Sequence, residues 1–175
     1  MASHVKLHDY TDGMKLEINE TTLAWLREAA SEVTSHAQRN CVMQDDAGKR
    51  LKGSYNYQIE YDSNNGEATV GTPLEEGYWE EFGTGEHADT AKNGGKPGRQ
   101  GWWVYVKGEA PREKVSKVYR DKVEAEAIAE SMKAEGLDAY ATNGRDPNYT
   151  LEKAFEATKN PAIAELKRRL KEMGK

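Results

Sequence analysis

Apolar and polar side chains alternate strictly over residues 54–61. A period of two gives a β-strand one apolar face and one solvated face. The residues on the predicted apolar face are Tyr55, Tyr57, Ile59 and Tyr61. The turn over residues 63–66 ends in Asn-Gly, which tolerates the positive φ angles of a tight hairpin. We therefore predict an antiparallel hairpin that returns over residues 67–72, with Ala68 and Val70 facing inward.

A helical repeat precedes this hairpin. From Asn19, which is suited to be an N-cap, apolar residues recur every three or four positions to about Arg39. The residues of this stripe are Leu23, Leu26, Ala30, Val33 and Ala37. We predict an amphipathic helix over residues 19–39 that packs on the hairpin. Residues 1–18 are polar and mixed, and we interpret them as an arm or an irregular first strand.

Residues 101–144 predict an inserted β-α-β unit. The segment GWWVYVKG is typical of a buried strand, and a capping box of Asp121 and Glu124 marks the start of a helix. The predicted apolar side of that helix is Val123, Ala127, Ile128 and Met132. Gly136 followed by Leu137 fits a C-terminal glycine cap, and the segment DAYAT predicts a second strand. If the two strands pair in parallel, the connection between them is right-handed.

The last segment of the chain predicts a helix that is interrupted by Pro161. Its apolar positions are Leu151, Ala154, Phe155, Thr158, Ile163, Leu166, Leu170 and Met173. Because Asn160 and Pro161 suit the N-cap and the first position of a helix, we expect two short helices or one kinked helix. Residues 89–101 are rich in glycine, and we interpret them as a flexible loop.

These elements predict an α+β fold in which an antiparallel hairpin packs against an N-terminal and a C-terminal helix. The length suits one ordinary domain. We expect a single domain with its core in residues 19–91 and 145–175 and the insert over residues 101–144. Leu, Ile, Val and Phe make up only 25 of the 175 residues, so the predicted core is thin. Because burial between copies can complete a thin core, the composition favours oligomerisation.

The net charge of −5 is unevenly distributed along the chain. Between Gly53 and Ala91 the sequence has nine acidic residues and no Lys or Arg, whereas residues 145–175 have eight basic and five acidic residues. Surfaces of opposite sign suit head-to-tail association of copies, although a solvated face is the plainer explanation of any one charge run.

The sequence contains no basic start followed by a long apolar run. We therefore predict neither a signal peptide nor a membrane span, and a soluble protein that stays inside the cell that makes it. The single cysteine, Cys41, excludes an internal disulfide and cannot form a thiolate metal site alone. We predict that Cys41 is a small buried apolar residue.

Residues 78–88, YWEEFGTGEHA, concentrate the candidate chemistry. Their Gly-x-Gly-x-x-Ala spacing suggests a dinucleotide-binding turn, which requires a buried strand before it and a helix that opens through it. Acidic residues precede this turn and would repel a pyrophosphate, and a glycine-rich loop follows it. We therefore expect no bound cofactor.

A metal-dependent hydrolase or nuclease is the alternative function for this stretch. Its candidate residues are Glu80, Glu81, Glu86, His87 and Asp89. Carboxylates with a histidine can bind a divalent ion, but these residues lack the spacing that brings ligands to one point. A solvated acidic loop is the simpler interpretation. The sequence also lacks a nucleophile elbow around a serine.

Nucleic-acid contact is a third interpretation, because a basic loop lies beside aromatic residues. These residues are Lys92, Lys96, Arg99, Trp102 and Trp103. Stacking platforms combine such side chains. The overall acidity of the chain argues against tight duplex binding, since affinity for DNA comes chiefly from neutralising phosphates.

The order of the elements, together with three motifs, resembles the neck or tail-completion proteins of tailed phages, the tenth-gene type of a lambda-like coliphage. Tyr78 and the run Glu81-Phe82-Gly83-Thr84-Gly85 match the family motif Tyr-Ala-x-x-Val-Glu-Phe-Gly-Thr-Gly. Residues 48–54 and 149–154 match in part, whereas residues 42–48 lack the proline and threonine of the family's first motif. The resemblance covers about two thirds of the chain and leaves out the insert.

The resemblance implies a non-enzymatic virion protein, without cofactor or metal, that joins the head connector to the tail. It implies a homohexameric ring, assembled in the cytoplasm of the host bacterium, which contacts the head stopper and the tail terminator or tail tube. Viral double-stranded DNA would pass through the ring without sequence-specific binding, and no membrane is involved.

The motif residues are expected to be structural, with glycines that permit a sharp corner after Phe82. We expect Tyr78 and Phe82 to point into the core and Glu80 and Glu81 to face solvent or a neighbouring subunit. The candidate subunit or partner contacts are Glu80, Glu86, Trp102, Trp103, Arg112 and Lys117. The acidic residues between positions 60 and 86 are the candidate lining of the ring.

Overall fold

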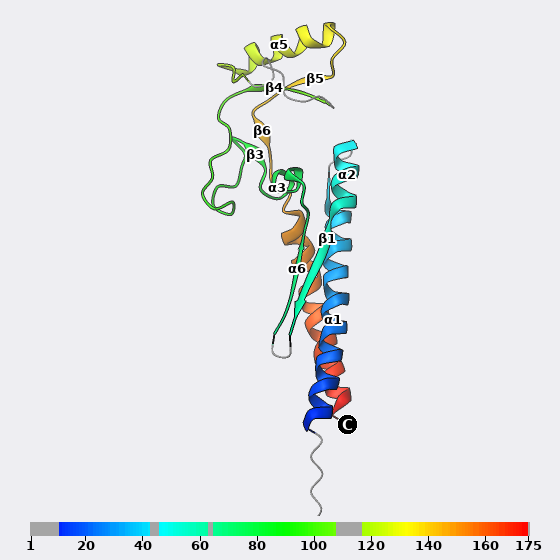
Figure 1. Ribbon diagram of the computed structural model, residues 1–175. Helices are drawn as coiled ribbons and strands as arrows, with labels where there is room; N and C mark the ends of the chain where they lie inside the picture. The colour runs from blue at the N-terminus through cyan, green and yellow to red at the C-terminus, as the bar shows by residue number, and fades with distance from the viewer. Residues whose placement is uncertain (1–10, 43–45, 63–64, 108–116, 175) are drawn as a thin grey trace, which may run out of the picture. The chain divides into compact units, whose positions relative to one another are not determined.

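The computed structural model describes residues 11–42, 46–62, 65–107 and 117–174, and the side chains from Lys15 onward (Figure 1). The chain divides into two compact units. The first comprises the chain up to Asn40, Lys49–Pro73 and the chain from Leu151, and the second comprises Cys41–Gly48 and Leu74–Thr150. Helices and small antiparallel sheets confirm the predicted α+β class. The single domain with an insert stays a prediction.

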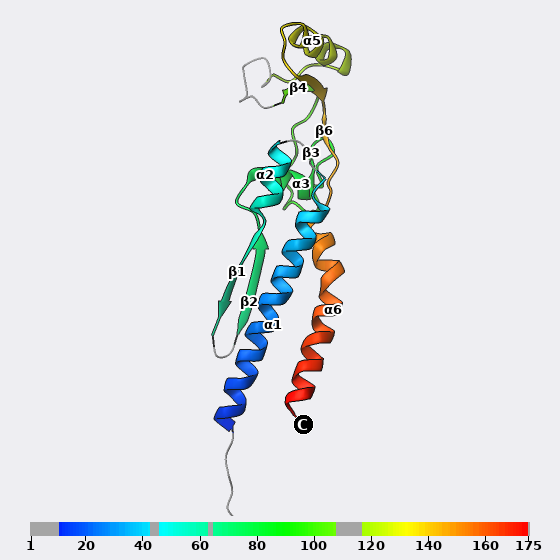
Figure 2. The same ribbon diagram turned by 90° about the vertical axis from the view of Figure 1, so that its right-hand side faces the viewer.

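The first unit is built on the predicted hairpin. Strands β1 (Asn56–Tyr61) and β2 (Gly66–Gly71) pair antiparallel, with Ile59 opposite Ala68. Exposed and half-buried residues alternate along β1, which confirms the period of two. Both strands contact α1, and Figure 2 shows the hairpin running alongside that helix. One face of the hairpin is therefore solvated and the other packs on α1.

Helix α1 (Thr11–Asn40) is longer than the sequence predicted. The predicted start at Asn19 is wrong, and so is the interpretation of the residues just before it as an arm or strand, because residues 11–18 are helical. Asn19 does not cap the helix: its backbone oxygen and Oδ1 lie 3.0 and 3.3 Å from the hydroxyl of Tyr61, which donates to them. The side chain of Asn19, which was predicted to cap the start of the helix, thus contacts the hairpin instead.

Helix α2 (Asp46–Ser54) was not predicted. The helix includes Ser54, so the strand begins at Asn56 rather than at residue 54. Ser54 Oγ donates to the backbone oxygen of Leu51 over 2.7 Å. Leu51 is fully buried, although the helix around it is largely basic and polar.

Helix α6 (Thr150–Met173) continues through Pro161 as one element, so the interpretation as two short helices is wrong. A proline removes one backbone donor from a helix, and the remaining hydrogen bonds on both sides can keep the helix continuous. Ala154 and Thr158 are buried, whereas Phe155 and Ile163 are exposed. The helix therefore shows apolar side chains to solvent along part of its length.

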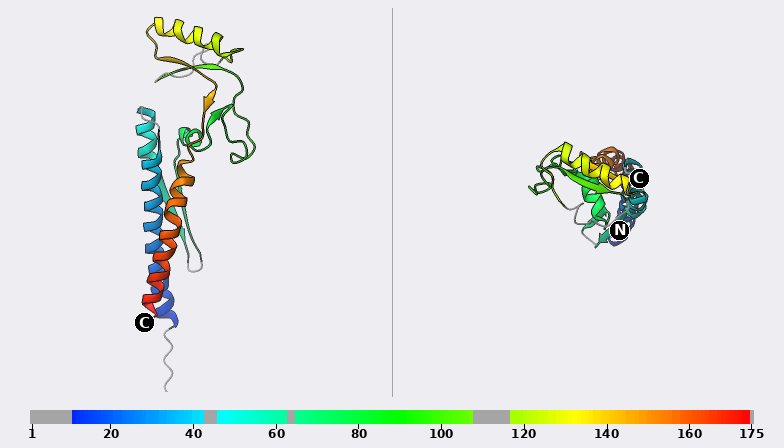
Figure 3. Two further views of the ribbon diagram at one scale, coloured as in Figure 1. Left: turned by 180° about the vertical axis from the view of Figure 1, so that it is seen from behind. Right: turned by 90° about the horizontal axis from the view of Figure 1, so that it is seen from above.

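The second unit contains a cluster of buried apolar residues. Strands β4 (Trp103–Val106) and β5 (Ala139–Thr142) carry one side of it, and α5 (Lys122–Ala134) covers them (Figure 3). The cluster consists of Val104, Val106, Tyr119, Ala125, Ala129, Met132 and Ala139. The predicted order of strand, helix and strand is confirmed.

The strands of this β-α-β unit are antiparallel, so the right-handed connection that parallel pairing would require does not apply. Tyr119 forms an antiparallel bridge with Trp102, which returns the chain to the beginning of β4 before α5 starts. The N–H of Lys107 then donates to the oxygen of Asp138, so β5 starts where β4 ends. The chain along β5 therefore runs back against β4.

Helix α5 has the predicted ends but not the predicted buried side. Asp121 Oδ1 accepts from the N–H of Glu124 over 3.0 Å, which confirms the N-cap. The N–H groups of Gly136 and Leu137 donate to Lys133 and Met132 and complete a Schellman motif.

The apolar side of α5 was wrong in two of its four members, since Val123 is 74% exposed and Ala127 is also exposed. The buried side is Ala125, Ala129 and Met132, with Ile128 partly buried. Alanine positions allow a helix to approach the small residues of β5 closely. The larger and more hydrophobic Val123 is therefore the residue that faces away.

Two smaller predictions concern single residues. Cys41 is 3% exposed, which confirms its prediction as a buried apolar residue. None of the helices in the described part of the chain is both long enough and apolar enough to cross a bilayer.

Candidate functional site

The motif stretch forms the short helix α3 (Glu75–Phe82), a turn and the strand β3 (Thr84–Gly85). Glu80 is 0% exposed and Glu81 is buried, whereas Tyr78 is exposed. The expectation that both glutamates face solvent or a neighbour, with Tyr78 in the core, is therefore wrong. Tyr78 and Phe82 do pack together, with ring centroids 5.1 Å apart.

The carboxylate of Glu80 is held by donors from distant parts of the sequence. Its Oε1 accepts from the N–H of Val42 over 2.7 Å and from Nδ2 of Asn148 over 3.0 Å. Its Oε2 lies 2.5 Å from Nη2 of Arg145. The hydroxyl of Thr150 adds a longer contact of 3.4 Å to Oε1. A buried carboxylate whose oxygens are ion-paired and hydrogen-bonded in this way holds the segments around it together.

Backbone hydrogen bonds also connect α3 to the segment that precedes α6. The N–H of Asn148 donates to the oxygen of Glu80 over 2.9 Å, and the N–H of Tyr149 donates to that of Glu81 over 3.2 Å. Tyr149 adopts φ 52°, a positive value that is uncommon for a residue other than glycine. The two glutamates therefore anchor a strained backbone segment through both side-chain and main-chain contacts.

The glycines of the motif are required by close backbone approach. Gly83 has φ 73°, which fits the interpretation of a sharp corner after Phe82. At Gly85 (φ 64°), a Cβ atom would lie 2.0 Å from the oxygen of Asn143. This crowding arises because β3 pairs antiparallel with β6 (Gly144–Arg145), with Gly85 opposite Gly144. The Gly-x-Gly pattern thus permits two chain segments to touch.

A second polar network joins the residues after β3 to Asn143, which lies between β5 and β6, and to Asp146, which follows β6. His87 Nδ1 lies 2.8 Å from Asp146 Oδ1, and His87 Nε2 lies 3.2 Å from Asn143 Oδ1. Asn143 Nδ2 donates to Glu86 Oε2, while the N–H of Gly101 donates to Glu86 Oε1, each over 3.0 Å. Both ring nitrogens of His87 face oxygen acceptors, which is the arrangement that a protonated imidazole satisfies.

These contacts change the acid–base properties of the network. The hydrogen bond to Asp146, followed by that to Asn143, raises the pKa of His87 above its ordinary value. The hydrogen bond from Asn143, followed by the N–H of Gly101, lowers the pKa of Glu86. At neutral pH the network therefore combines an anionic Glu86 with a histidine that is more readily protonated than usual.

The glycine-rich loop over residues 89–101 has a defined hydrogen-bonded structure. Asp89 Oδ1 accepts from the N–H groups of Ala91 and Lys92 over 3.0 and 3.2 Å, and Oδ2 accepts from the hydroxyl of Tyr149 over 2.8 Å. The bond from Tyr149 is the main cause of the lowered pKa of Asp89. The amino group of Lys92 lies 4.4 Å from the centroid of the Tyr149 ring. The predicted flexibility of this loop stays a prediction.

The acids proposed for the hydrolase alternative have separate structural partners. Glu80 pairs with Arg145, Glu86 with Asn143 and Asp89 with Tyr149. Across the residues whose positions are described, no group of three His, Cys, Asp or Glu side chains is placed to hold a metal ion. The enzyme alternative stays a prediction.

The candidate partner contacts differ in accessibility. Glu80 is buried, Trp102 and Trp103 are half-buried, and Glu86 and Lys117 are exposed, while Arg112 lies outside the described residues. Glu80 and Glu81 also lack the exposure that the proposed acidic lining needs. Whether the exposed residues touch a partner stays a prediction.

The first unit contains an apolar groove that the sequence did not reveal. It has a volume of about 420 Å³ and lies between α1, β2 and α6. Its larger apolar side chains are Trp25, Leu26, Val33, Val70, Leu151, Phe155 and Ile163. Phe155 is 55% exposed at its edge. The sequence showed the apolar periodicity of each element but not that these elements leave space between them.

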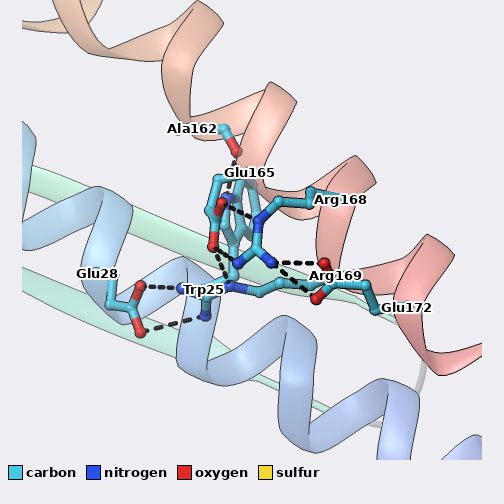
Figure 4. A network of polar contacts seen from close by, with 7 residues as sticks. All are labelled: Trp25, Glu28, Ala162, Glu165, Arg168, Arg169 and Glu172. Carbon is cyan, nitrogen blue, oxygen red and sulfur yellow. Dashed lines mark hydrogen bonds and ion pairs between the residues drawn. The ribbon is translucent and has the colours of Figure 1, made fainter.

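Polar contacts connect α1 to α6 (Figure 4). The indole Nε1 of Trp25 donates to the oxygen of Ala162 over 2.6 Å, and Arg169 pairs with Glu28 over 2.5 Å. Glu165 accepts from Arg168 and Arg169, and these bonds lower its pKa to about 2. Long polar side chains thus bridge the two helices.

No protein-family model, curated protein or solved structure matches this chain.

Proposed function

We propose that this chain is a structural virion protein of a tailed-phage neck, which joins the head connector to the tail as a ring of copies around the DNA path. The observation that carries the proposal is the apolar groove between α1, β2 and α6. A groove of this size with a half-exposed phenylalanine at its edge is a surface that assembly partners commonly bury.

The composition supports assembly as well. Only 25 of the 175 residues are Leu, Ile, Val or Phe, and two of them, Phe155 and Ile163, stand exposed on the groove side of α6. A chain with so few large apolar residues gains stability by burying them against another subunit. The groove is therefore the surface through which copies, or a neck neighbour, would associate.

The motif stretch supports a structural role for the residues that carry the family resemblance. Glu80 and Glu81 are buried, and the glycines at positions 83 and 85 permit backbone contact with the segment before α6. In this arrangement the conspicuous charges and glycines of the motif stabilise the fold. They need no substrate to account for their presence.

The proposal is tested by measuring the mass of the purified protein and imaging it by negative-stain electron microscopy. We expect ring-shaped oligomers of uniform copy number at micromolar concentration. Phe155→Asp and Ile163→Asp place a charge on the groove, and each should shift the protein to monomers without loss of helix content by circular dichroism.

Asn160→Asp is the matched control, because it adds the same charge at an exposed position of the same helix. This variant should assemble like the unmodified protein. A wild-type chain that remains monomeric over a wide range of concentration and salt, with no ring in any image, would refute the proposal.

A further inference from the structure

The β4–β5 sheet has one face that the apolar cluster does not cover. Residues Trp102, Val104, Val106, Ala139 and Ala141 point toward α5 and pack in the cluster. Because side chains alternate across a strand, the residues between them point to the opposite face. The residues of that opposite face are Trp103, Tyr105, Tyr140 and Thr142.

The exposed face is unusually rich in aromatic rings. Tyr105 lies directly opposite Tyr140 in the antiparallel ladder, and Trp103 lies opposite Thr142. Tyr105 is 44% exposed and Tyr140 is 48% exposed. Trp103 and Tyr105 are two residues apart on one strand, which places their Cα atoms about 7 Å apart. Tyr105 and Tyr140 thus present exposed rings from the two strands, whereas Trp103 is half-buried with part of its ring close to Gly85.

Cations lie against the rings at both ends of this face. The guanidinium of Arg99 lies 5.3 Å from the centroid of Trp103, and the amino group of Lys133 lies 5.3 Å from that of Tyr140. The segment 96–107, which includes β4, contains three basic residues and no acidic residue. Two acidic side chains lie at the Tyr140 end: Asp138 accepts a hydrogen bond from the hydroxyl of Tyr140, and Glu130 pairs with the amino group of Lys133 over 2.9 Å.

We propose that this face, formed by Trp103, Tyr105 and Tyr140, binds single-stranded nucleic acid. Unpaired bases stack on the exposed rings, and the flanking Arg99 and Lys133 face the phosphates. The combination of flat aromatic rings and adjacent cations is the one that sequence-tolerant binders of single strands use. A duplex keeps its bases stacked inside and cannot use such rings in the same way.

The chemistry also sets the strength and the salt dependence of this binding. The net charge of −5 opposes a polyanion, so the rings must supply a large part of the affinity. The few cations at the face give a shallow decrease in affinity with salt, compared with proteins that neutralise many phosphates. The inference goes beyond the assembly role, and its failure would leave that proposal unchanged.

The experiment measures fluorescence anisotropy of a labelled oligothymidylate of about 12 nucleotides, titrated with the full chain at low salt. We expect saturable binding that a duplex of equal length competes for poorly. Tyr105→Ala and Tyr140→Ala should each weaken the affinity by at least about fivefold. Tyr105→Phe and Tyr140→Phe keep the rings and should bind like the unmodified protein.

Val123→Ala is the matched control, because it removes an exposed apolar side chain from the same unit on α5. It should leave the affinity unchanged. The proposal is overturned if the unmodified protein does not bind the oligonucleotide, if both alanine variants bind as tightly as it does while folded, or if the duplex binds equally well. Loss of affinity in both phenylalanine variants would also overturn it, because the rings would then not be the binding element.

Discussion

Arg145 and Glu80, which are 65 residues apart in the sequence, form an ion pair with an N···O distance of 2.5 Å around a carboxylate that has no exposed surface. The guanidinium keeps about a third of its side-chain surface in solvent (34%). The pair is therefore asymmetric, because Arg145 can be rehydrated when its partner is lost and Glu80 cannot.

This asymmetry predicts the effect of removing Arg145. Arg145→Met leaves the charge of Glu80 buried without its counter-ion and should lower the free energy of unfolding by about 3–5 kcal/mol. Adding Glu80→Gln to Arg145→Met removes the unpaired charge and should recover part of that loss. Urea unfolding of the single and double variants measures both effects.

Glu75→Gln serves as the control for this pair, since it changes an exposed glutamate on the same helix. It should alter the free energy of unfolding by less than about 0.5 kcal/mol. If Arg145→Met were as stable as the unmodified protein, the ion pair would have no structural role.

Gly85 of the motif and Gly94 of the 89–101 loop both have a positive φ, and comparing them separates the cost of that conformation from the cost of a clash. Gly94 has φ 77° and open space where a Cβ would lie, so Gly94→Ala should cost about 1–2 kcal/mol through conformation alone. Gly85→Ala adds a clash with the backbone of Asn143 and should cost clearly more. Equal midpoints of thermal unfolding for the two variants would show that β3 and β6 can separate without penalty.

The network around His87 predicts a pH dependence with a definite sign. Since the hydrogen bonds to Asp146 and Asn143 raise the pKa of His87, the folded state holds the proton more tightly than the unfolded state. The resulting stabilisation is fully present below the unfolded pKa of about 6.5 and is lost as the pH rises through the folded value.

Asp146→Asn should lower the pKa of His87 in an NMR titration, because it removes the charged acceptor. The other histidines of the same protein provide internal controls, and their titrations should not move. A His87 titration that is unaffected by Asp146→Asn would contradict the hydrogen bond between them.

The outer face of the hairpin carries two like charges in direct opposition, because Glu60 pairs with Glu67 in the register of β1 and β2. Like charges opposite each other on a sheet are unfavourable. Glu67→Lys should therefore raise the midpoint of thermal unfolding, and the gain should shrink at high salt. Glu67→Gln should give a smaller increase, and a decrease in both variants would exclude repulsion as the dominant effect.

The parts of the fold that were predictable from the sequence are those whose signal is local. The hairpin shows a period of two because one of its faces is solvated, and the ends of α5 show the residues that capping chemistry requires. These signals depend on neighbours within a few positions. The start of α1 at Thr11 was missed because Asn19 has the residue type of an N-cap, although it lies inside the helix and contacts Tyr61.

The candidate sites depended on contacts that the sequence does not show. Two adjacent glutamates ordinarily indicate a solvated surface. No residue near Glu80 in the sequence indicates that Arg145 and Asn148 will bind its carboxylate. The buried side of α5 could not be predicted from the sequence either. Ala125 and Ala129 are buried because they pack on the sheet, although other residues of the helix are more hydrophobic. The groove of the first unit arises from the spacing of α1, β2 and α6. The sequence of any one of these elements therefore does not predict it.

The two-residue ladder between β3 and β6 brings the two ends of the intervening chain side by side. Gly85 and Gly144 are direct partners, so the stretch between them leaves and re-enters the fold at points about 5 Å apart. A turn of a few residues can span such a gap. Replacing the chain through β4, α5 and β5 with a short loop should therefore leave the Glu80–Arg145 pair in place.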